Sequence, residues 1–421
     1  MKVVTEPVKQ TSSATDLRLG LSSGALYPEV LTEDVPAIAA RWGVRDLELM
    51  LQTPGEYEAG FVRRLLMTCR AAGCRVHAVH SFESLIQVTS PYRRRAAEAR
   101  GFFDRVITAT AALGAGVLVW HGPRRREVET PEGWERFIAA TADLAAACGE
   151  AGVTLALENV SWCALPTVRD VMAFAARLGE IGPPERVGFA FDPFQAASAG
   201  ANPFMVLAAM GDRVVDVHLS DHREGESRER RLPPGAGDLP WSALLRAVAG
   251  SYRGPLMIEA HLTQDPEAFA RVRGLLTPIL GSLAINDDPC QDAPPAGVLT
   301  GIRLFNERQF YECHEEIEHE WHAERRPIRA LYQGILQIGV GFHHARAGNH
   351  KGAILLLTDG IEKTARFIPT CQGIDTVRLV AESQACLDRM VALGAGRMHE
   401  FDWENVPFVH VVDLRAARHS E

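Results

Sequence analysis

The chain has 421 residues, which suggests roughly two or three domains of ~100 to 200 residues each. Hydrophobic residues make up 47% and charged residues 23%, a balance that can bury a large core and excludes a disordered chain. The net charge of −9 argues against a nucleic-acid surface, because phosphate binding needs a dense basic field. The apolar runs are shorter than the ~20 residues of a membrane-spanning helix, so we expect no membrane span.

Cysteine and lysine usage narrows the possible chemistry further. The eight cysteines include no CxxC pair, and no signal-peptide pattern opens the chain, so we expect reduced thiols in a cytoplasmic protein. The lysines are Lys2, Lys9, Lys351 and Lys363. Any chemistry between residues 10 and 350 must therefore proceed without a lysine amine.

Eight short apolar runs alternate with longer amphipathic segments in the first two thirds of the chain. The runs lie at 17–23, 46–51, 75–81, 116–122, 154–160, 187–193, 214–221 and 254–262. Eight strand–helix pairs predict an α/β fold, a (β/α)8 TIM barrel over residues 17–284, which matches the typical size of ~250 residues. A doubly wound open sheet is the alternative, but no GxGxxG follows the first strand.

The remaining segments differ in composition from the barrel. Residues 1–16 predict a flexible polar leader, and the Pro-rich residues 285–299 predict a linker. In residues 300–421 the apolar spacing becomes helical in four segments, which predicts a small all-α bundle domain.

Four ionisable residues stand at or near the ends of consecutive expected strands: Glu158, Asp192, His218 and Glu259. The carboxyl ends of barrel strands converge, so we expect these side chains to meet at the barrel mouth. Their mixed oxygen and nitrogen donors suit Mn, Mg, Co, Fe or Zn, and without a cation the three carboxylates would repel one another. The pattern predicts a divalent-metal site; separate helix caps and surface ion pairs are the alternative.

The segments LALENV, FAFDP, DVHLSD and GPLMIEAH, with LPPGAGDLPW at 232–241, resemble the xylose-isomerase-like barrel superfamily. This superfamily includes sugar isomerases and epimerases, inosose dehydratases and endonuclease IV. The resemblance covers residues 17–284 and implies that the four strand-end residues ligate a catalytic divalent metal. In the isomerase and epimerase branch it implies that Glu158 and Glu259 also move a proton on and off the carbon beside a carbonyl.

Four further residues are assigned to substrate binding: His80, His121, Gln195 and Arg231. His80 and His121 end the third and fourth strands, and similar histidines bind additional zinc ions in endonuclease IV. Gln195 replaces the histidine of the superfamily's DxxH pattern, and Glu229-Arg-Arg231 stands where the endonuclease has Asp-x-His. These departures argue against a complete three-metal site. Histidines that bond only to neighbouring backbone remain the alternative for His80 and His121.

The loop after the seventh strand is charged and rich in arginine. It contains Arg223, Arg228, Arg230 and Arg231, which could clamp a phosphate or carboxylate of a substrate. A plain solvated loop is the alternative, because runs of charge usually face water.

A second candidate site lies in the expected helical domain. His314, Glu318 and Trp321 share one helix face, since residues three and four apart align. This HxxxExxW pattern, with FNERQFYE and YQGILQIGVGFHHARAGNHKGAILLL, resembles domain-of-unknown-function family 309 over residues 300–368. The resemblance implicates His314 and Glu318 in metal binding, with His343 or His344 as a partner; a His–Glu pair that merely stabilises the bundle is the alternative.

Three functional hypotheses follow. The first is a divalent-metal-dependent isomerase or epimerase of a small sugar or hydroxy-carbonyl compound, acting by proton transfer through an enediolate. Schiff-base chemistry would stabilise the same carbanion but requires a lysine, which the barrel lacks. The second is a metal-dependent hydrolase of a phosphoester or amide, with dehydratase chemistry also present in the superfamily. The third is a non-catalytic barrel that senses a ligand. We expect a small-molecule partner and allow for a homo-oligomer.

Overall fold

A computed structural model describes residues 17–81, 87–223, 225, 231–262, 266–284 and 289–411. The expected leader at 1–16 lies outside the described residues, as do Arg228 and Arg230. Within the described part of the chain, no helix combines the length and the apolar character that crossing a membrane requires.

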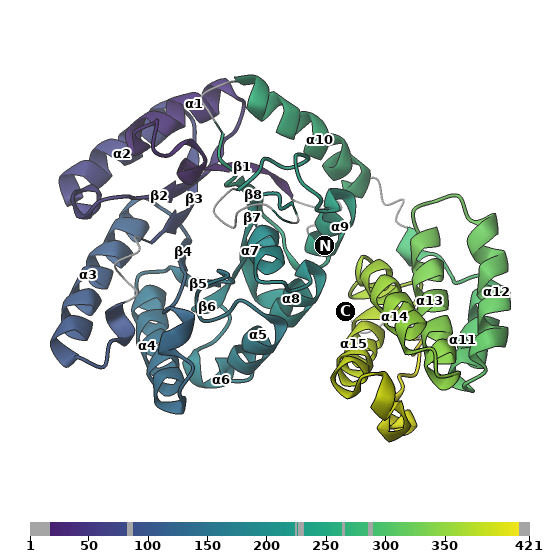
Figure 1. Ribbon diagram of the computed structural model, residues 1–421. Helices are drawn as coiled ribbons and strands as arrows, with labels where there is room; N and C mark the ends of the chain where they lie inside the picture. The colour runs from purple at the N-terminus through teal and green to yellow at the C-terminus, as the bar shows by residue number, and fades with distance from the viewer. Residues whose placement is uncertain are drawn as a thin grey trace, which may run out of the picture.

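The first part of the chain is a closed barrel of parallel strands in sequence order, in which β1 pairs with both β2 and β8 (Figure 1). The strands are β1 (Arg18–Ser22), β2 (Asp46–Met50), β3 (Arg75–His80), β4 (Val117–Trp120), β5 (Thr154–Glu158), β6 (Val187–Phe191), β7 (Val214–Leu219) and β8 (Pro255–Ile258). The predicted (β/α)8 barrel is confirmed, and each strand falls within an expected apolar run. Apolar residues fill most positions of these runs because parallel strands are buried on both faces.

Helices cover the outside of the barrel (Figure 1). They are α1 (Val35–Arg41), α2 (Ala59–Ala71), α3 (Arg93–Ala112), α4 (Pro131–Glu150), α5 (Val168–Ala175), α6 (Leu178–Ile181), α7 (Pro193–Ser198), α8 (Pro203–Met210), α9 (Trp241–Ser251) and α10 (Pro266–Ala284). Local sequence sets their ends: α4 begins where the Thr130 hydroxyl accepts from the Gly133 amide, and it is followed by Gly152 at φ 71°.

The main core lies between the strands and these helices and continues into the helical region. A second, smaller cluster of buried apolar residues consists of Ala78, Val117, Val119, Ala156 and Ala190. In β4, β5 and β6 these residues alternate with residues of the first cluster, so they point into the barrel. Small side chains there leave room for the polar groups that reach inward near the mouth.

The helical region contains α11 (Ala296–Asn306), α12 (Phe310–Ala323), α13 (Arg329–Arg346), α14 (His350–Ala365) and α15 (Thr376–Leu393). Four helices were expected here, but a turn with Arg308 at φ 64° divides the first expected segment into α11 and α12. Helix α11 also starts inside the expected linker. The region also contains a short antiparallel hairpin that the sequence did not predict. Its strands, β9 (Thr370–Cys371) and β10 (Ile374–Asp375), have two residues each.

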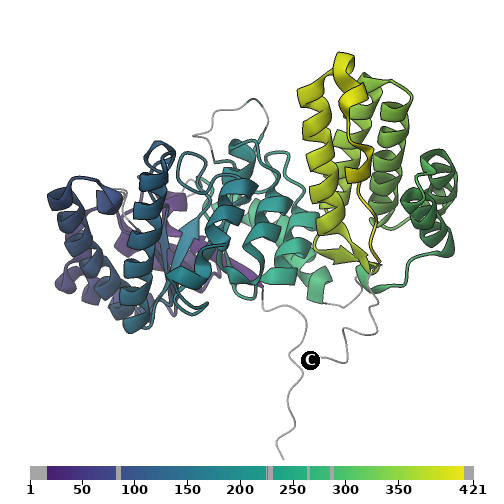
Figure 2. The ribbon, with the colours of Figure 1, turned by 90° about the horizontal axis from the view of Figure 1, so that it is seen from below.

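Helix α15 of this region contacts the barrel through α8. Figures 1 and 2 agree that α15 lies on the side near the barrel and α12 on the far side. We propose that residues 17–284 and 300–421 form separate domains joined by the intervening linker.

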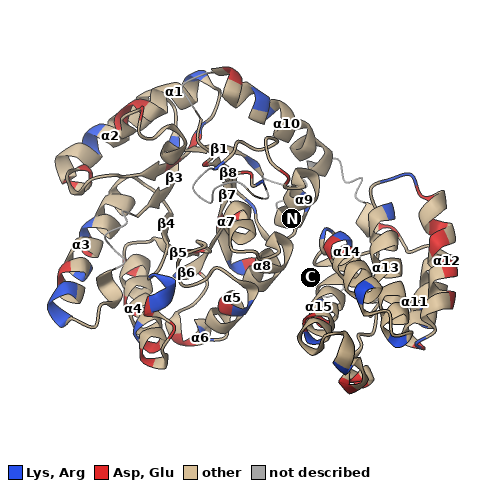
Figure 3. Ribbon diagram, viewed as in Figure 1, with Lys and Arg blue, Asp and Glu red and all other residues tan. Residues whose placement is uncertain are grey.

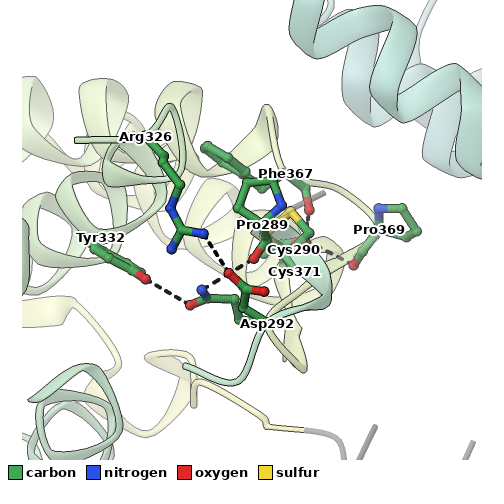
Figure 4. Close-up of a disulfide and its surroundings, with 10 residues drawn as sticks. Pro289, Cys290, Asp292, Arg326, Tyr332, Phe367, Pro369 and Cys371 are labelled. Carbon is green, nitrogen blue, oxygen red and sulfur yellow. Dashed lines mark hydrogen bonds and ion pairs between the residues drawn. A yellow bond between two sulfur atoms is a disulfide. The ribbon is translucent and has the colours of Figure 1, made fainter. Parts of the chain in front are cut away.

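A disulfide joins Cys290 to Cys371 in β9 (Figure 4). The expectation that all the cysteines are reduced is therefore wrong for this pair, while the other six are buried free thiols. The two cysteines are 81 positions apart in sequence, and a cross-link closing a loop of about this length is worth roughly 4.5 kcal/mol by chain entropy. The bond thus ties the segment that leaves the barrel to the hairpin that follows α14.

Candidate metal centre at the barrel mouth

The four strand-end residues converge as the sequence predicted. One donor atom from each of Glu158, Asp192, His218 and Glu259 lies within 4.8 Å of the others, and all four side chains are buried. His218 Nδ1 lies 3.4 Å from Glu158 Oε1 and 3.1 Å from Glu259 Oε2. The barrel closure therefore brings together three carboxylates and an imidazole from four strands, a donor set that can hold a divalent cation.

The local conformation of Asp192 leaves one carboxylate oxygen free. Asp192 caps α7, with Oδ1 accepting from the amides of Phe194 at 2.7 Å and Gln195 at 3.2 Å. The Asn159 amide bonds to both the N–H and the C=O of Asp192, each at 2.8 Å. Asp192 Oδ2 is buried and has no hydrogen-bond partner among the described residues. Such an atom costs free energy unless something binds it, so its position indicates a ligand.

Burial and neighbouring charges shift the pKa values of the three carboxyl groups in different directions. Burial raises the pKa of Asp192 to about 7. Burial also raises the pKa of Glu158, but the charges of His218 and His121 outweigh it and hold the pKa well below its usual range. For Glu259, Arg231 and His218 outweigh burial and lower the pKa to about 2. At neutral pH both glutamates are ionised and can act as ligands or bases.

Burial lowers the pKa of His218, but the charges of Glu48, Glu259 and Glu158 outweigh burial and hold the pKa well above its usual range. Without a cation, His218 therefore supplies positive charge to the cluster. A bound cation would replace that proton.

His80 and His121 meet at the second oxygen of Glu158. The Nε2 atoms of both histidines lie 3.2 Å from Glu158 Oε2 and 3.1 Å from each other. His80 Nδ1 lies 3.2 Å from the Ser81 carbonyl, which requires a proton on Nδ1. Two ligands of a tetrahedral zinc ion are about 3.4 Å apart, so this triangle is also of a size that can hold an ion. The backbone contact of His80 exists, but it leaves Nε2 free to face Glu158.

Of the other expected substrate contacts, Arg231 faces the site and Gln195 does not. The Arg231 guanidinium pairs with Glu259 Oε1. Gln195 is buried, and its Oε1 accepts from the Ser161 amide at 2.9 Å, so it fastens the loop after β5. A cavity of about 560 Å³ opens at the mouth and is lined by Gly24, Tyr27, Met50, Leu51, Gln52, His80, Ser81, His121, Arg231, Glu259 and His261.

Sequence reasoning missed two buried carboxylates that lie behind His218. Glu48 Oε2 lies 2.9 Å from His218 Nε2, and Asp216 Oδ2 lies 3.6 Å from the same atom. The two acids stand inside apolar strands, in DLELM and VVDVHL, and that placement was the available signal. An acid in a strand buried on both faces needs a partner.

Asp221 was also missed. Its carboxylate accepts from the amides of Gly235 at 2.7 Å and Leu239 at 3.1 Å and from the Trp241 indole at 2.8 Å. Its backbone forms a bridge with Leu232, the residue after Arg231. Asp221 therefore organises the LPPGAGD segment and fixes the backbone beside Arg231. Arg223 points elsewhere in this loop, to the Ala236 carbonyl.

The second candidate site is less closely assembled. His314 Nε2 lies 3.8 Å from Glu318 Oε1, while Trp321 packs beneath the guanidinium of Arg329. The His343 ring contacts the ring of Tyr311, with centroids 5.7 Å apart. Among the described residues, the groups of three or more ligands close enough to share an ion are all in the barrel. His314, Glu318, Trp321 and His343 therefore do not form a metal tripod here.

Two parts of the chain match known protein families. Residues 36–276, more than half of the chain, match the family described as xylose isomerase-like TIM barrel, and the protein belongs to that family. Residues 298–356 match the domain of unknown function DUF309. A search of the curated proteins finds no significant match.

Solved structures share the barrel at low sequence identity. A xylose isomerase domain protein from Planctomyces limnophilus aligns with a TM-score of 0.51 at 20% identity, over 65% of this chain and 99% of that chain. An L-ribulose 3-epimerase aligns at 0.52 and 20% identity, over 63% and 95%. The IOLI protein with a bound zinc atom aligns at 0.52 and 16% identity, over 63% and 98%. At these identities the likeness shows the fold.

Proposed function

We propose that the protein is a divalent-metal-dependent isomerase or epimerase of a small ketose or related hydroxy-carbonyl compound. The observation that carries the proposal is the convergence of Glu158, Asp192, His218 and Glu259 beside a cavity of about 560 Å³. The family and the similar L-ribulose 3-epimerase support the choice of reaction.

The donor set fits a divalent cation held by the four strand-end residues. The buried, unpartnered Asp192 Oδ2 is the atom that most needs such a ligand. When bound, the cation supplies electrostatic stabilisation of the charge that develops on a substrate hydroxyl and the adjacent carbonyl oxygen. The absence of lysine between residues 10 and 350 removes the imine route to the same carbanion.

The two glutamates are the proposed acid/base pair, and their surroundings differ. Glu259 lines the cavity, whereas Glu158 is enclosed by His80, His121 and His218. Glu259, ionised at neutral pH, is therefore placed to take a proton from a substrate carbon. Glu158 is also ionised, so it would return a proton only after receiving one from a neighbouring histidine such as His80, whose Nε2 lies 3.2 Å from Glu158 Oε2. Arg231, next to Glu259 in the cavity wall, can orient substrate oxygens through its N–H groups.

The test is proton exchange in deuterated water. Purified protein loaded with Mn²⁺ or Co²⁺ is incubated with a panel of pentuloses and hexuloses, and deuterium at the carbons beside the carbonyl is followed by NMR. We expect incorporation and epimer formation, and a loss of at least ~100-fold in Glu158→Gln and Glu259→Gln, as removal of an acid or base predicts. Glu180→Gln, an exposed acid on α6, is the control and should behave as wild type.

Unchanged turnover in both glutamine variants would contradict the assigned roles. The absence of deuterium incorporation across the panel, combined with hydrolysis of a phosphoester or an amide in a parallel assay, would favour the hydrolase instead.

A metal-dependent hydrolase is the second candidate, and one observation favours it. His80, His121 and Glu158 form a separate group of potential ligands that shares Glu158 with the first. Ions held by these two groups would supply water activation for hydrolysis of a phosphoester or amide. Metal analysis separates the candidates: two tightly held zinc ions per chain favour the hydrolase, and one ion favours the isomerase.

We also propose that the protein acts in the cytoplasm on a small molecule, without a nucleic-acid or membrane partner. The net charge of −9 and the six buried free thiols support this. The disulfide is compatible with it, because both of its cysteines are buried and shielded from soluble reductants.

A further inference from the structure

Glu48 is a buried acid in the middle of the barrel that none of the roles above uses. It lies on β2 with no exposed surface, directly beside Ser22 in the register of β1 and β2. The Ser22 hydroxyl donates to Glu48 Oε1 at 2.8 Å, while the Gly24 amide donates to Ser22 Oγ at 3.3 Å. Because the Gly24 N–H occupies the oxygen of Ser22, the hydroxyl hydrogen is free to point at Glu48. Ser22 therefore binds Oε1 of the Glu48 carboxylate and leaves Oε2 available for another partner.

That second oxygen meets one specific nitrogen of His218. Glu48 Oε2 lies 2.9 Å from Nε2, on the opposite side of the ring from Nδ1. Nδ1 in turn faces the two glutamates of the mouth, 3.4 Å from Glu158 Oε1 and 3.1 Å from Glu259 Oε2. The ring thus bridges an inner carboxylate and the candidate metal ligands.

A nitrogen can coordinate a cation only through a lone pair, so Nδ1 must be free of its proton when His218 acts as a ligand. The remaining proton must then reside on Nε2. A carboxylate oxygen at 2.9 Å accepts that proton and disfavours the other tautomer. It also restrains rotation of the ring.

We propose that Glu48 is a positioning residue that fixes His218 in the Nε2–H tautomer and aims Nδ1 at Glu158, Asp192 and Glu259. The inference rests on the proposed function, since it concerns how one ligand of the proposed metal is prepared. Glu48 touches neither substrate nor cation in this role and acts through His218 alone.

Glu48→Gln is the diagnostic substitution because it keeps the size of the side chain. The amide oxygen would accept from Ser22, which turns the NH₂ group toward His218 Nε2. That group donates, so it favours a proton on Nδ1 and blocks the ligand. Glu48→Asp keeps an acceptor at shorter reach. Asp46→Asn is the matched control: Asp46 is a buried acid two residues earlier on β2, but it pairs with Arg18 at 2.8 Å and Arg75 at 2.9 Å.

The measurement is Co²⁺ affinity of the full-length protein by chelator competition, with the visible absorption of bound Co²⁺ as a report on the ligand set. We expect Glu48→Gln to bind Co²⁺ about 10- to 100-fold more weakly with a changed spectrum, Glu48→Asp to recover part of the affinity, and Asp46→Asn to bind as wild type.

The proposal would be overturned by wild-type affinity and spectrum in Glu48→Gln, or by an equal loss of affinity in Asp46→Asn. It would also be overturned if Glu48→Gln lost a whole second equivalent of Co²⁺, because Glu48 would then itself be a ligand. Should Glu48→Gln fail to fold, Glu48→Asp and Ser22→Ala decide, since unchanged affinity and spectrum in both would equally refute the role. Wild-type protein that binds no Co²⁺ would instead contradict the proposed function.

Discussion

The barrel mouth and the outer face of α12 contain the same kinds of residues, yet they differ in how those residues are brought together. At the mouth, buried Glu158 and Glu259 flank His218 from separate strands. On α12, Glu318 Oε1 lies 3.8 Å from His314 Nε2 and 3.7 Å from His322 Nε2, and the three side chains are 41%, 28% and 63% exposed. Figure 3 shows acidic residues along α12 on the outside of the molecule.

The difference lies in geometry rather than composition. His314 and His322 are eight residues apart, which is about 12 Å along a helix axis, so one ion cannot bind both. Strands that end around a barrel mouth instead direct their side chains to one point, and burial there makes an unbound carboxylate costly. Convergence with burial is therefore the feature that separates a candidate site from a solvated stripe.

The largest expected effect tests this contrast directly. Asp192→Asn should weaken Zn²⁺ or Co²⁺ binding by at least ~100-fold, because loss of a direct ligand costs no less than loss of a residue behind one. Asparagine caps helices as well as aspartate does, so α7 should remain intact. Glu318→Gln on α12 is the counterpart and should leave affinity and stoichiometry unchanged, as measured by chelator competition. An equal loss of metal affinity in both variants would contradict the proposed difference between the barrel mouth and α12.

The strands and the candidate ligands at the barrel mouth could be predicted from the sequence, but some of their partners could not. The eight strands were predictable because each is a short apolar run, and the four candidate ligands were predictable because they stand where such runs end. Glu48 stands inside an apolar strand, which signals a buried acid in need of a partner, but that partner, His218, is 170 residues away and no local pattern pairs them. The same separation in sequence hid the disulfide of Cys290 with Cys371.

Within the helical region, periodicity indicated helices but not their ends. A single left-handed residue, Arg308, divides α11 from α12, and arginine gives no sign of such a turn. Helix α12 does carry the expected HxxxExxW face. What the sequence left open was whether anything opposite that face completes a site.

A smaller effect concerns pH at the mouth. With its pKa raised to about 7, Asp192 holds a proton below that pH, and a cation must displace it to bind Oδ2. Metal affinity should therefore fall by up to an additional tenfold per pH unit below about 7, and this component should vanish above it. Chelator competition between pH 5.5 and 8 measures the slope. Asp192→Asn should lack the break near pH 7; a break near pH 4 in the wild type would mean that Asp192 titrates as an ordinary exposed carboxyl.

The smallest effect is expected on α12. Glu318 pairs with His314 and His322 only at 3.8 and 3.7 Å, and all three side chains are partly exposed. Exposed pairs of this kind contribute about 0.2 to 0.5 kcal/mol, and only while the histidine is protonated. Glu318→Gln should thus change the free energy of unfolding in urea by less than about 0.5 kcal/mol, with or without added Zn²⁺. The contrary result would be an increase of several degrees in Tm when Zn²⁺ is added to the Asp192→Asn variant. If the double variant Asp192→Asn, Glu318→Gln lost that increase, a metal would bind on α12. The requirement for burial and convergence would then be too strict for this protein.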